Sequence, residues 1–114
     1  MRAWNNLGIA HDRLGNRADA ISAFKEAIRA KRDDALGYYN LGTAYLKTAW
    51  GAPSEDAISN LEQAVKLNPN YSDAWNNLGE AYLKEKPSGD AINAFRKVIK
   101  LNHFRLKAKE FNII

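Results

Sequence analysis

The sequence contains no cysteine, and this absence removes several classes of chemistry at once. Disulfide bonds, thiolate metal sites and cysteine nucleophiles are all excluded. Proline and glycine are also scarce, with three and seven residues, so the composition is not that of a linker or a fibrous chain. What remains is 46% hydrophobic and 26% charged residues over 114 positions. This composition predicts a single folded domain rather than a disordered segment.

Long apolar runs are absent as well, because no stretch approaches the roughly 20 residues that a membrane-spanning helix needs. The N-terminus turns polar at Asn5 and shows no signal-peptide core. We therefore expect a cytoplasmic protein without a membrane partner. Because the chain opens directly on a repeated motif, the sequence is also compatible with a segment of a longer protein.

The net charge of +4 is concentrated towards the C-terminus, where five basic residues follow position 96 within a short span. These are Lys97, Lys100, Arg105, Lys107 and Lys109. Such a run is more often a solvated helix surface than a nucleic-acid contact, so we favour the first interpretation. Nucleic acid is an unlikely partner on this basis.

One short motif occurs three times. The letters AWNNLG stand at residues 3–8 and again at 74–79, and GYYNLG stands at 37–42. Each copy is headed by an aromatic residue (Trp4, Tyr38 or Trp75) and is followed by a second segment with alanine and an aromatic or leucine at helical spacing. Apolar positions at i, i+3, i+4 and i+7 predict helices, so each copy should form a helical hairpin.

The spacing of the copies locates an insertion. Trp4 and Tyr38 are 34 residues apart, whereas Tyr38 and Trp75 are 37 apart. The second segments show the reverse order, because Ala20 and Ala57 are 37 apart and Ala57 and Ala91 only 34. Three extra residues are therefore predicted within residues 47–56, in a turn that contains Trp50. Trp50 is either a local plug over this turn or an exposed contact residue.

The pattern resembles the tetratricopeptide repeat, whose signature is W-x2-L-G-x2-Y followed by alanine, aromatic, alanine and proline in 34 residues. The resemblance covers nearly the whole chain. It implies an all-α, right-handed α-solenoid of three antiparallel helical hairpins. We assign repeat one to residues 1–34, repeat two to 35–71 with its insertion, repeat three to 72–105, and a partial C-terminal helix to 106–114. Copies one and three depart from the family at Arg32 and His103, where copy two has the usual proline, Pro69.

Nothing in the sequence assembles an active site, since catalysis needs converging acids, bases or ligands. The two histidines, His11 and His103, belong to different predicted hairpins. His11 replaces a packing tyrosine of the family, which favours a core or half-buried role. The aromatics that head the copies are in phase with leucine and glycine, which favours core packing over base stacking. We expect no enzyme activity, cofactor or metal.

In the family, the first helix of each hairpin lines a concave groove, and the phase left over by the core residues marks the groove positions. The candidate peptide-binding residues are Asn5, Asn6, Ile9, Leu36, Tyr39, Asn40, Thr43, Leu46, Asn76, Asn77, Glu80 and Leu83.

Asparagine recurs at one position in all three copies, as Asn6, Asn40 and Asn77. Its amide both donates and accepts, which matches a peptide bond. The resemblance implies two roles. In O-linked N-acetylglucosamine transferases such a ladder grips a peptide backbone, whereas elsewhere the same asparagine bonds to a neighbouring helix. Both interpretations stay open on the sequence.

Co-chaperones of this family hold the terminal carboxylate of heat-shock chaperones with lysines, an arginine and asparagines. At the matching positions this chain has Asn5, Ile9, Asn40, Asp73 and Asn77, and only Asn40 agrees. The cations are missing and Asp73 would repel a carboxylate, so we predict that this clamp is absent.

The predicted function is a non-catalytic protein-protein interaction module that binds a partner's peptide in the groove and serves as a scaffold for assembly. The first alternative is the substrate-recognition domain of a larger, glycosyltransferase-like enzyme. The second is a helical repeat that binds nucleic acid. The C-terminal letters RLKAKEFNII are expected to start a helix over Ala91, Phe95 and Val98, and the exposed ends of the solenoid are expected to support self-association.

Overall fold

The computed structural model describes residues 2–48, 54–85 and 89–110, and the side chains among them except those of Ser54 and residues 107–110. This part of the chain is entirely helical apart from turns. Its six helices are α1 (Arg2–Arg13), α2 (Arg17–Ala30), α3 (Ala35–Lys47), α4 (Ser54–Leu67), α5 (Ser72–Glu85) and α6 (Gly89–Glu110). The all-α prediction is therefore confirmed.

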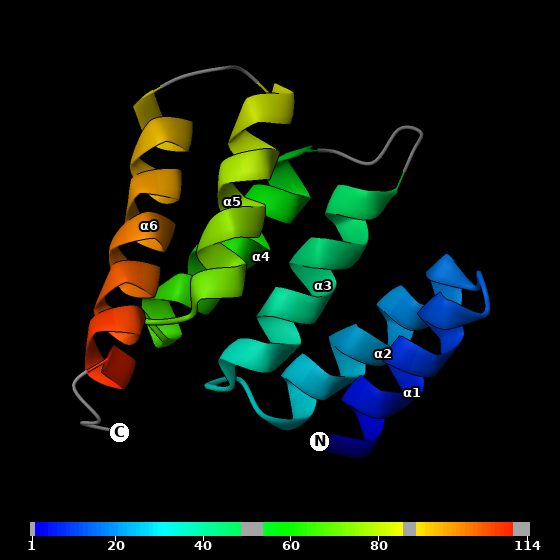
Figure 1. Cartoon of the computed structure of the whole chain (residues 1–114). Helices are drawn as coiled ribbons and strands as arrows, with labels where there is room; N and C mark the ends of the chain where they lie inside the picture. The colour runs from blue at the N-terminus through cyan, green and yellow to red at the C-terminus, as the bar shows by residue number, and fades with distance from the viewer. Residues whose placement is uncertain (1, 49–53, 86–88, 111–114) are drawn as a thin grey trace.

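The helices form three antiparallel hairpins that stack in chain order. Within the hairpins α1 packs on α2, α3 on α4 and α5 on α6, and between them α2 packs on α3 and α4 on α5. The first helices also touch directly, α1 against α3 and α3 against α5. Figure 1 shows this order from right to left, with α1 and α2 at the right and α6 at the left edge. Among the described helices no contact joins the first hairpin to the third, which is the arrangement of a solenoid.

The turns between hairpins show why α3 and α5 begin where they do. Asp34 caps the N-terminus of α3, its carboxylate accepting a hydrogen bond of 3.1 Å from the backbone N–H of Leu36. Before α5, Asn68 accepts from the N–H of Asn70 at 3.2 Å, and the indole N–H of Trp75 donates to the carbonyl of Pro69 at 2.8 Å. Trp75 thus ties the start of α5 to the preceding turn.

The glycine of each motif packs so closely against the second helix of its hairpin that a side chain would not fit. A Cβ added at Gly42 would lie 2.7 Å from Cγ of Leu61 and 3.1 Å from that residue's backbone nitrogen. At Gly79 the same atom would lie 2.8 Å from the ring of Phe95, and at Gly8 it would clash with the ring of Phe24. The recurring glycine is therefore explained by packing alone.

The core is built from small residues interleaved with a few large ones. The cluster between the second and third hairpins holds Ala57, Leu61, Ala64, Val65, Ala74, Leu78 and Ala81, with Trp75 and Tyr82 packed against it. The cluster between the first and second hairpins is smaller and holds Ala20, Phe24, Leu41 and Ala44. Both clusters bring together residues of successive copies, so each copy is a packing surface for the next.

Within the hairpins, the connection between α3 and α4 spans more residues than the other two connections. Three residues, 14–16, separate α1 from α2, and three, 86–88, separate α5 from α6, whereas residues 48–53 separate α3 from α4. The additional three residues thus fall where the repeat spacing placed them. Trp50 lies outside the described residues.

The C-terminal segment differs from the prediction of a separate partial helix over residues 106–114. Residues 106–110 continue α6, which runs unbroken from Gly89 to Glu110, and residues 111–114 lie outside the described part. No proline stops α6, because His103 stands at the position of Pro69 and keeps its backbone N–H. A second difference is that no further hairpin follows α6 in the described chain, whereas α2, which also lacks a proline at Arg32, ends at Ala30 before the capped start of α3. Leu106 is 66% exposed on this extension and does not fold back over the third hairpin.

Candidate functional site

The first helices of the hairpins line a face with two adjoining hollows. The larger lies between α3 and α5 and has a volume of about 450 Å³. Its lining residues are Thr43, Leu46, Lys47, Asn77, Glu80, Leu83 and Lys84. Its lining thus combines two leucines with two lysines and one glutamate.

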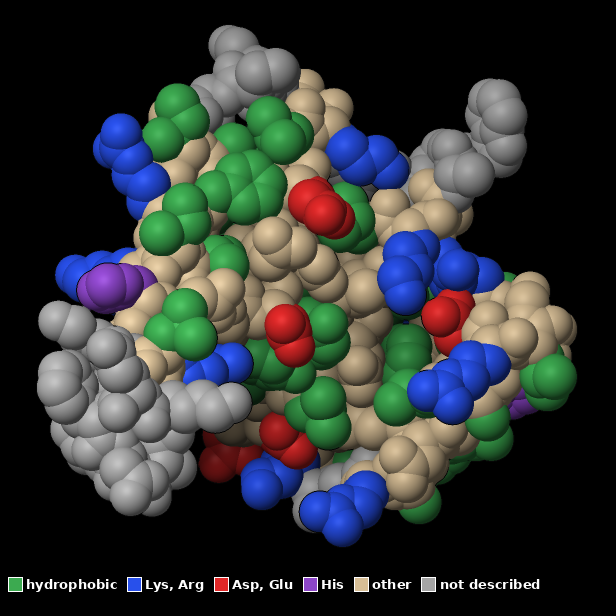
Figure 2. All heavy atoms as spheres, viewed as in Figure 1, with side chains coloured by type: hydrophobic (Ala, Val, Ile, Leu, Met, Phe, Trp, Pro, Cys, Tyr) green, Lys and Arg blue, Asp and Glu red, His purple; other side chains and the backbone are tan. Residues whose placement is uncertain are grey.

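The smaller hollow lies between α1 and α3 and has a volume of about 240 Å³. It is lined by Ile9, Asp12, Arg13, Phe24, Tyr39, Asn40, Thr43, Ala44 and Lys47. Thr43 and Lys47 belong to both hollows, so the two are parts of one groove that crosses α1, α3 and α5. In Figure 2, which has the viewpoint of Figure 1, basic, acidic and apolar side chains are interspersed over these helices.

Eight of the twelve residues predicted from the sequence line this groove: Ile9, Tyr39, Asn40, Thr43, Leu46, Asn77, Glu80 and Leu83. The other four do not line either hollow. Asn6 and Leu36 are exposed and Asn76 is half-buried. The prediction that Asn5 contacts a peptide is wrong, because its side chain is only 3% exposed and a ligand cannot reach it.

Asn5 is buried because it faces the next first helix. Nδ2 of Asn40 on α3 donates to Oδ1 of Asn5 on α1 at 3.2 Å. One step further, Nδ2 of Asn77 on α5 donates to the hydroxyl of Thr43 on α3 at 2.9 Å. Two of the three recurring asparagines therefore bond to the preceding first helix, whereas Asn6, with no first helix before it in the described chain, is exposed. The geometry favours the structural role that the sequence left open.

Tyr39 lies where these contacts meet. Burial and the charge of Asp73 raise the pKa of its hydroxyl, and hydrogen bonds to Thr43 and Asn77 oppose that rise. Its ring stacks against Tyr71 with centroids 4.8 Å apart. Burial, with Tyr39 and the nearby aspartates, raises the pKa of Tyr71 to about 12. Tyr71 was not predicted; its place directly after Asn68-Pro69-Asn70, at the turn into a first helix, was the available signal.

A row of cations at one edge of the groove was also missing from the predicted site. Arg13, Lys47 and Lys84 occupy the same position of the three motifs, at the last turns of α1, α3 and α5. Nζ of Lys84 donates to the carbonyl oxygen of Leu46 on α3 at 3.0 Å. Cations at these helix ends complement the helix dipole, which explains the residue type without a ligand. They nevertheless give this edge a positive charge.

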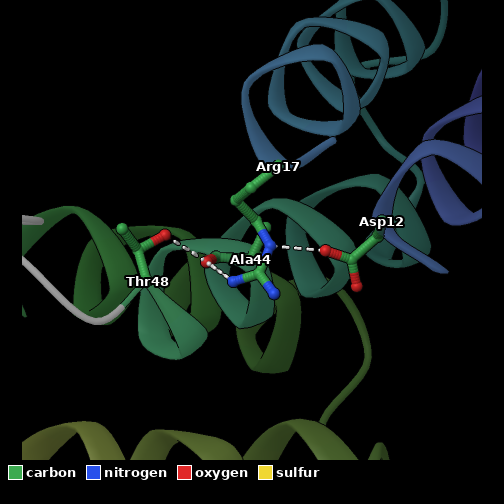
Figure 3. A network of polar contacts seen from close by, with 4 residues as sticks. All are labelled: Asp12, Arg17, Ala44 and Thr48. Carbon is green, nitrogen blue, oxygen red and sulfur yellow. Dashed lines mark hydrogen bonds and ion pairs between the residues drawn. The ribbon is translucent and has the colours of Figure 1, made fainter. Parts of the chain in front are cut away.

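A network of polar contacts connects the first hairpin to the second (Figure 3). Arg17, at the start of α2, forms an ion pair with Asp12 of α1, and its Nη1 donates to the carbonyl oxygen of Ala44 on α3 at 3.3 Å. The hydroxyl of Thr48 donates to the same carbonyl at 2.8 Å. The negative charge of Asp12 is thus paired with Arg17. Glu80 is the other acidic residue that lines the groove, and it forms no such ion pair among the described contacts.

The two histidines, which the sequence offered as candidates for catalysis, lie on different hairpins. His11 is half-buried on α1, and His103 is exposed on α6. Within residues 2–48, 54–85 and 89–110, no group of His, Asp and Glu is placed to hold a metal ion. None of the described helices is long and apolar enough to cross a membrane.

Family comparisons agree with this geometry. Tetratricopeptide repeat models match residues 1–34 and 72–103, and a TPR repeat model matches residues 54–85. The last match covers α4 and α5, the second helix of one hairpin and the first helix of the next. No curated protein sequence matches the chain.

Similar solved structures include the second TPR of Spaghetti (RPAP3) bound to the HSP90 peptide SRMEEVD. It is 27% identical, with a TM-score of 0.81 over 87% of this chain and 89% of that one. Two structures of MamA are each 30% identical with TM-scores of 0.80, over 88% and 89% of this chain. The chain spans 57% and 54% of the two MamA chains.

Proposed function

Because this chain belongs to the tetratricopeptide repeat family and is a protein-interaction module of that fold, we propose that it binds a peptide segment of a partner protein in the groove across α1, α3 and α5. Binding of this segment would make the chain a scaffold for assembly. The observation that carries the proposal is the continuity of the two hollows through Thr43 and Lys47.

The lining favours a particular kind of peptide. Leu46 and Leu83 present apolar surface in the larger hollow, and Leu83 is 47% exposed in the absence of a ligand. Lys47 and Lys84 stand beside them, and Asp12 is already paired with Arg17. An apolar side chain of the peptide would bury the leucines, and an acidic neighbour would meet the lysines.

The asparagines contribute less to this proposal than the leucines and lysines. Asn40 and Asn77 each use an amide N–H on a neighbouring helix, so a backbone ladder has only their remaining donors and acceptors. The similar Spaghetti domain binds an HSP90 peptide with both apolar and acidic residues. In this chain Asn5 is buried against Asn40, and Asp73 is exposed, so we expect no dependence on a terminal carboxylate.

Selection from a displayed peptide library, followed by calorimetric titration of the selected peptide, tests the proposal. Replacing Leu83→Ser should weaken binding roughly tenfold or more, because an anchoring apolar contact is lost. Leu7→Ser is the matched control, since Leu7 is 45% exposed on α1 but does not line the groove. The selected peptides should be enriched in acidic residues next to apolar ones.

Equal weakening by the two serine variants would contradict binding in the groove. A second measurement concerns the terminal carboxylate: the peptide SRMEEVD and its C-terminal amide should bind equally well or equally poorly. A strong preference for the free carboxylate would show that a chaperone-type clamp operates despite the missing cations.

A further inference from the structure

The outer face of α6 carries a line of exposed apolar side chains. Ile92, Ile99 and Leu106 are 54%, 67% and 66% exposed. They are seven residues apart, which is two helical turns, so they follow one another along the same side of the helix. Hydrophobic side chains are visible along α6 at the left of Figure 2. This face is not explained by packing within the described chain.

The earlier hairpins show what covers an equivalent face. Val65 on α4 holds the motif position of Ile99, and it is only 7% exposed because it joins the core cluster with Ala74 and Leu78 of α5. On α2 the same position is Ile28, whose Cγ1 lies 3.1 Å from a Cβ added at Gly37 of α3. In both cases the first helix of the following hairpin covers the face.

The outer face of α1 is the complement of this surface. Leu7 is 45% exposed, whereas the equivalent Leu41 of α3 and Leu78 of α5 are 5% and 1% exposed. Trp4 is 41% exposed, although its counterparts Tyr38 and Trp75 pack against the core. The sequence predicted core packing for Trp4, and the structure corrects this, because the described chain offers no helix for Trp4 to pack against. Within the described residues there is thus one uncovered second-helix face and one uncovered first-helix face.

We propose that a second copy of this chain covers the α6 face, with its α1 placed on α6 as α3 lies on α2 and α5 lies on α4. The contact would bury Trp4 and Leu7 of one copy against Ile92 and Ile99 of the other. It uses the two ends of the solenoid and leaves the groove of both copies open. It is therefore independent of the proposed peptide binding.

Such an interface is head-to-tail, since different surfaces of the two copies meet. Each bound copy still offers a free α1 face at one end and a free α6 face at the other, so the association continues to longer stacks or closes into a ring. The average mass in solution should consequently rise steadily with concentration rather than stop at a dimer.

Sedimentation velocity from low to high micromolar concentration measures this rise. Leu7→Glu should disable the α1 face and Ile99→Glu the α6 face, each raising the dissociation constant roughly tenfold or more by placing a charge in an apolar contact. Both residues are exposed, so the variants should keep their helical circular dichroism. A wild-type chain that stays monomeric at every concentration would overturn the proposal.

Mixing the two variants gives the sharper result. The Leu7→Glu chain keeps its α6 face and the Ile99→Glu chain keeps its α1 face, so an equimolar mixture should form a one-to-one dimer that cannot grow. A symmetric contact would give a different pattern, in which one variant alone still associates. Leu83→Glu, which adds the same charge within the groove, should associate like the wild type; its failure to associate would place the contact in the groove and overturn the end-to-end arrangement.

Discussion

The two steps of the solenoid, from the first hairpin to the second and from the second to the third, use one motif but different chemistry. The second step has the larger apolar core and is the more apolar of the two: Leu61 and Leu78 are 0% and 1% exposed within a cluster of seven buried residues. The first step has four residues in its cluster. Asn40 bonds across it as Asn77 does across the second step, but Arg17, which is paired with Asp12, adds a bond to the carbonyl of Ala44. Among the described contacts, no such ion-paired arginine bonds across the second step.

This difference shows how a repeat tolerates variation. Position 12 of the motif holds Asp12 in the first copy but Leu46 and Leu83 in the others, and Arg17 corresponds to Ser54 and Ser88. A paired charge replaces apolar surface in the first step, and the groove is more polar there. Because partly exposed ion pairs stabilise less than a buried core, the first hairpin should open before the other two.

The largest effect should come from the apolar step. Leu78→Ala removes a fully buried side chain between α4 and α5 and should lower the free energy of unfolding by ~2–5 kcal/mol, measured by urea denaturation. Leu14→Ala, at a residue 77% exposed after α1, is the control and should change it by less than ~0.5 kcal/mol. Similar losses in the two variants would mean that the second step is not the stable centre of the molecule.

A smaller and more local effect is expected in the polar step. Arg17→Ala removes the ion pair to Asp12 and the bond to the carbonyl of Ala44 and should cost about 1–2 kcal/mol, since both side chains are partly buried. Hydrogen exchange should accelerate in α1 and α2 while α4 and α5 keep their protection. Uniform acceleration along the chain would show that the three hairpins open together.

The sequence was sufficient for the fold because the motif residues act locally and repeat. Glycine at positions 8, 42 and 79 and the large residues opposite them, Phe24, Leu61 and Phe95, already determine how each hairpin packs. The groove was predicted in part, since the helical phase identified Thr43, Leu46 and Leu83 but could not show that Asn5 faces another helix.

Other features depend on the relation between copies, which periodicity does not specify. The contacts of Arg17 join α1, α2 and α3. Asp12 and Arg17 are not repeated at the equivalent positions of the other copies, so the repeat pattern could not predict these contacts. The extension of α6 past His103 is permitted by the missing proline but not specified by it, since α2 ends at Ala30 although Arg32 also replaces the proline.

The smallest effects are expected for the three recurring asparagines. They test whether an asparagine stabilises the fold because of its motif position or because it bonds to a neighbouring helix. Asn40 donates across the first step and Asn77 across the second, so Asn40→Ala and Asn77→Ala should each lower the free energy of unfolding by ~0.5–1.5 kcal/mol in urea denaturation. Asn6→Ala is the matched control, because Asn6 holds the same motif position but is exposed, and alanine is the better helix former; it should leave stability unchanged or slightly raised. The affinity for a selected peptide should change little in all three variants.

If instead stability is unaltered and affinity falls in all three, the asparagines bind the peptide backbone, and their contacts between helices are only the ligand-free arrangement.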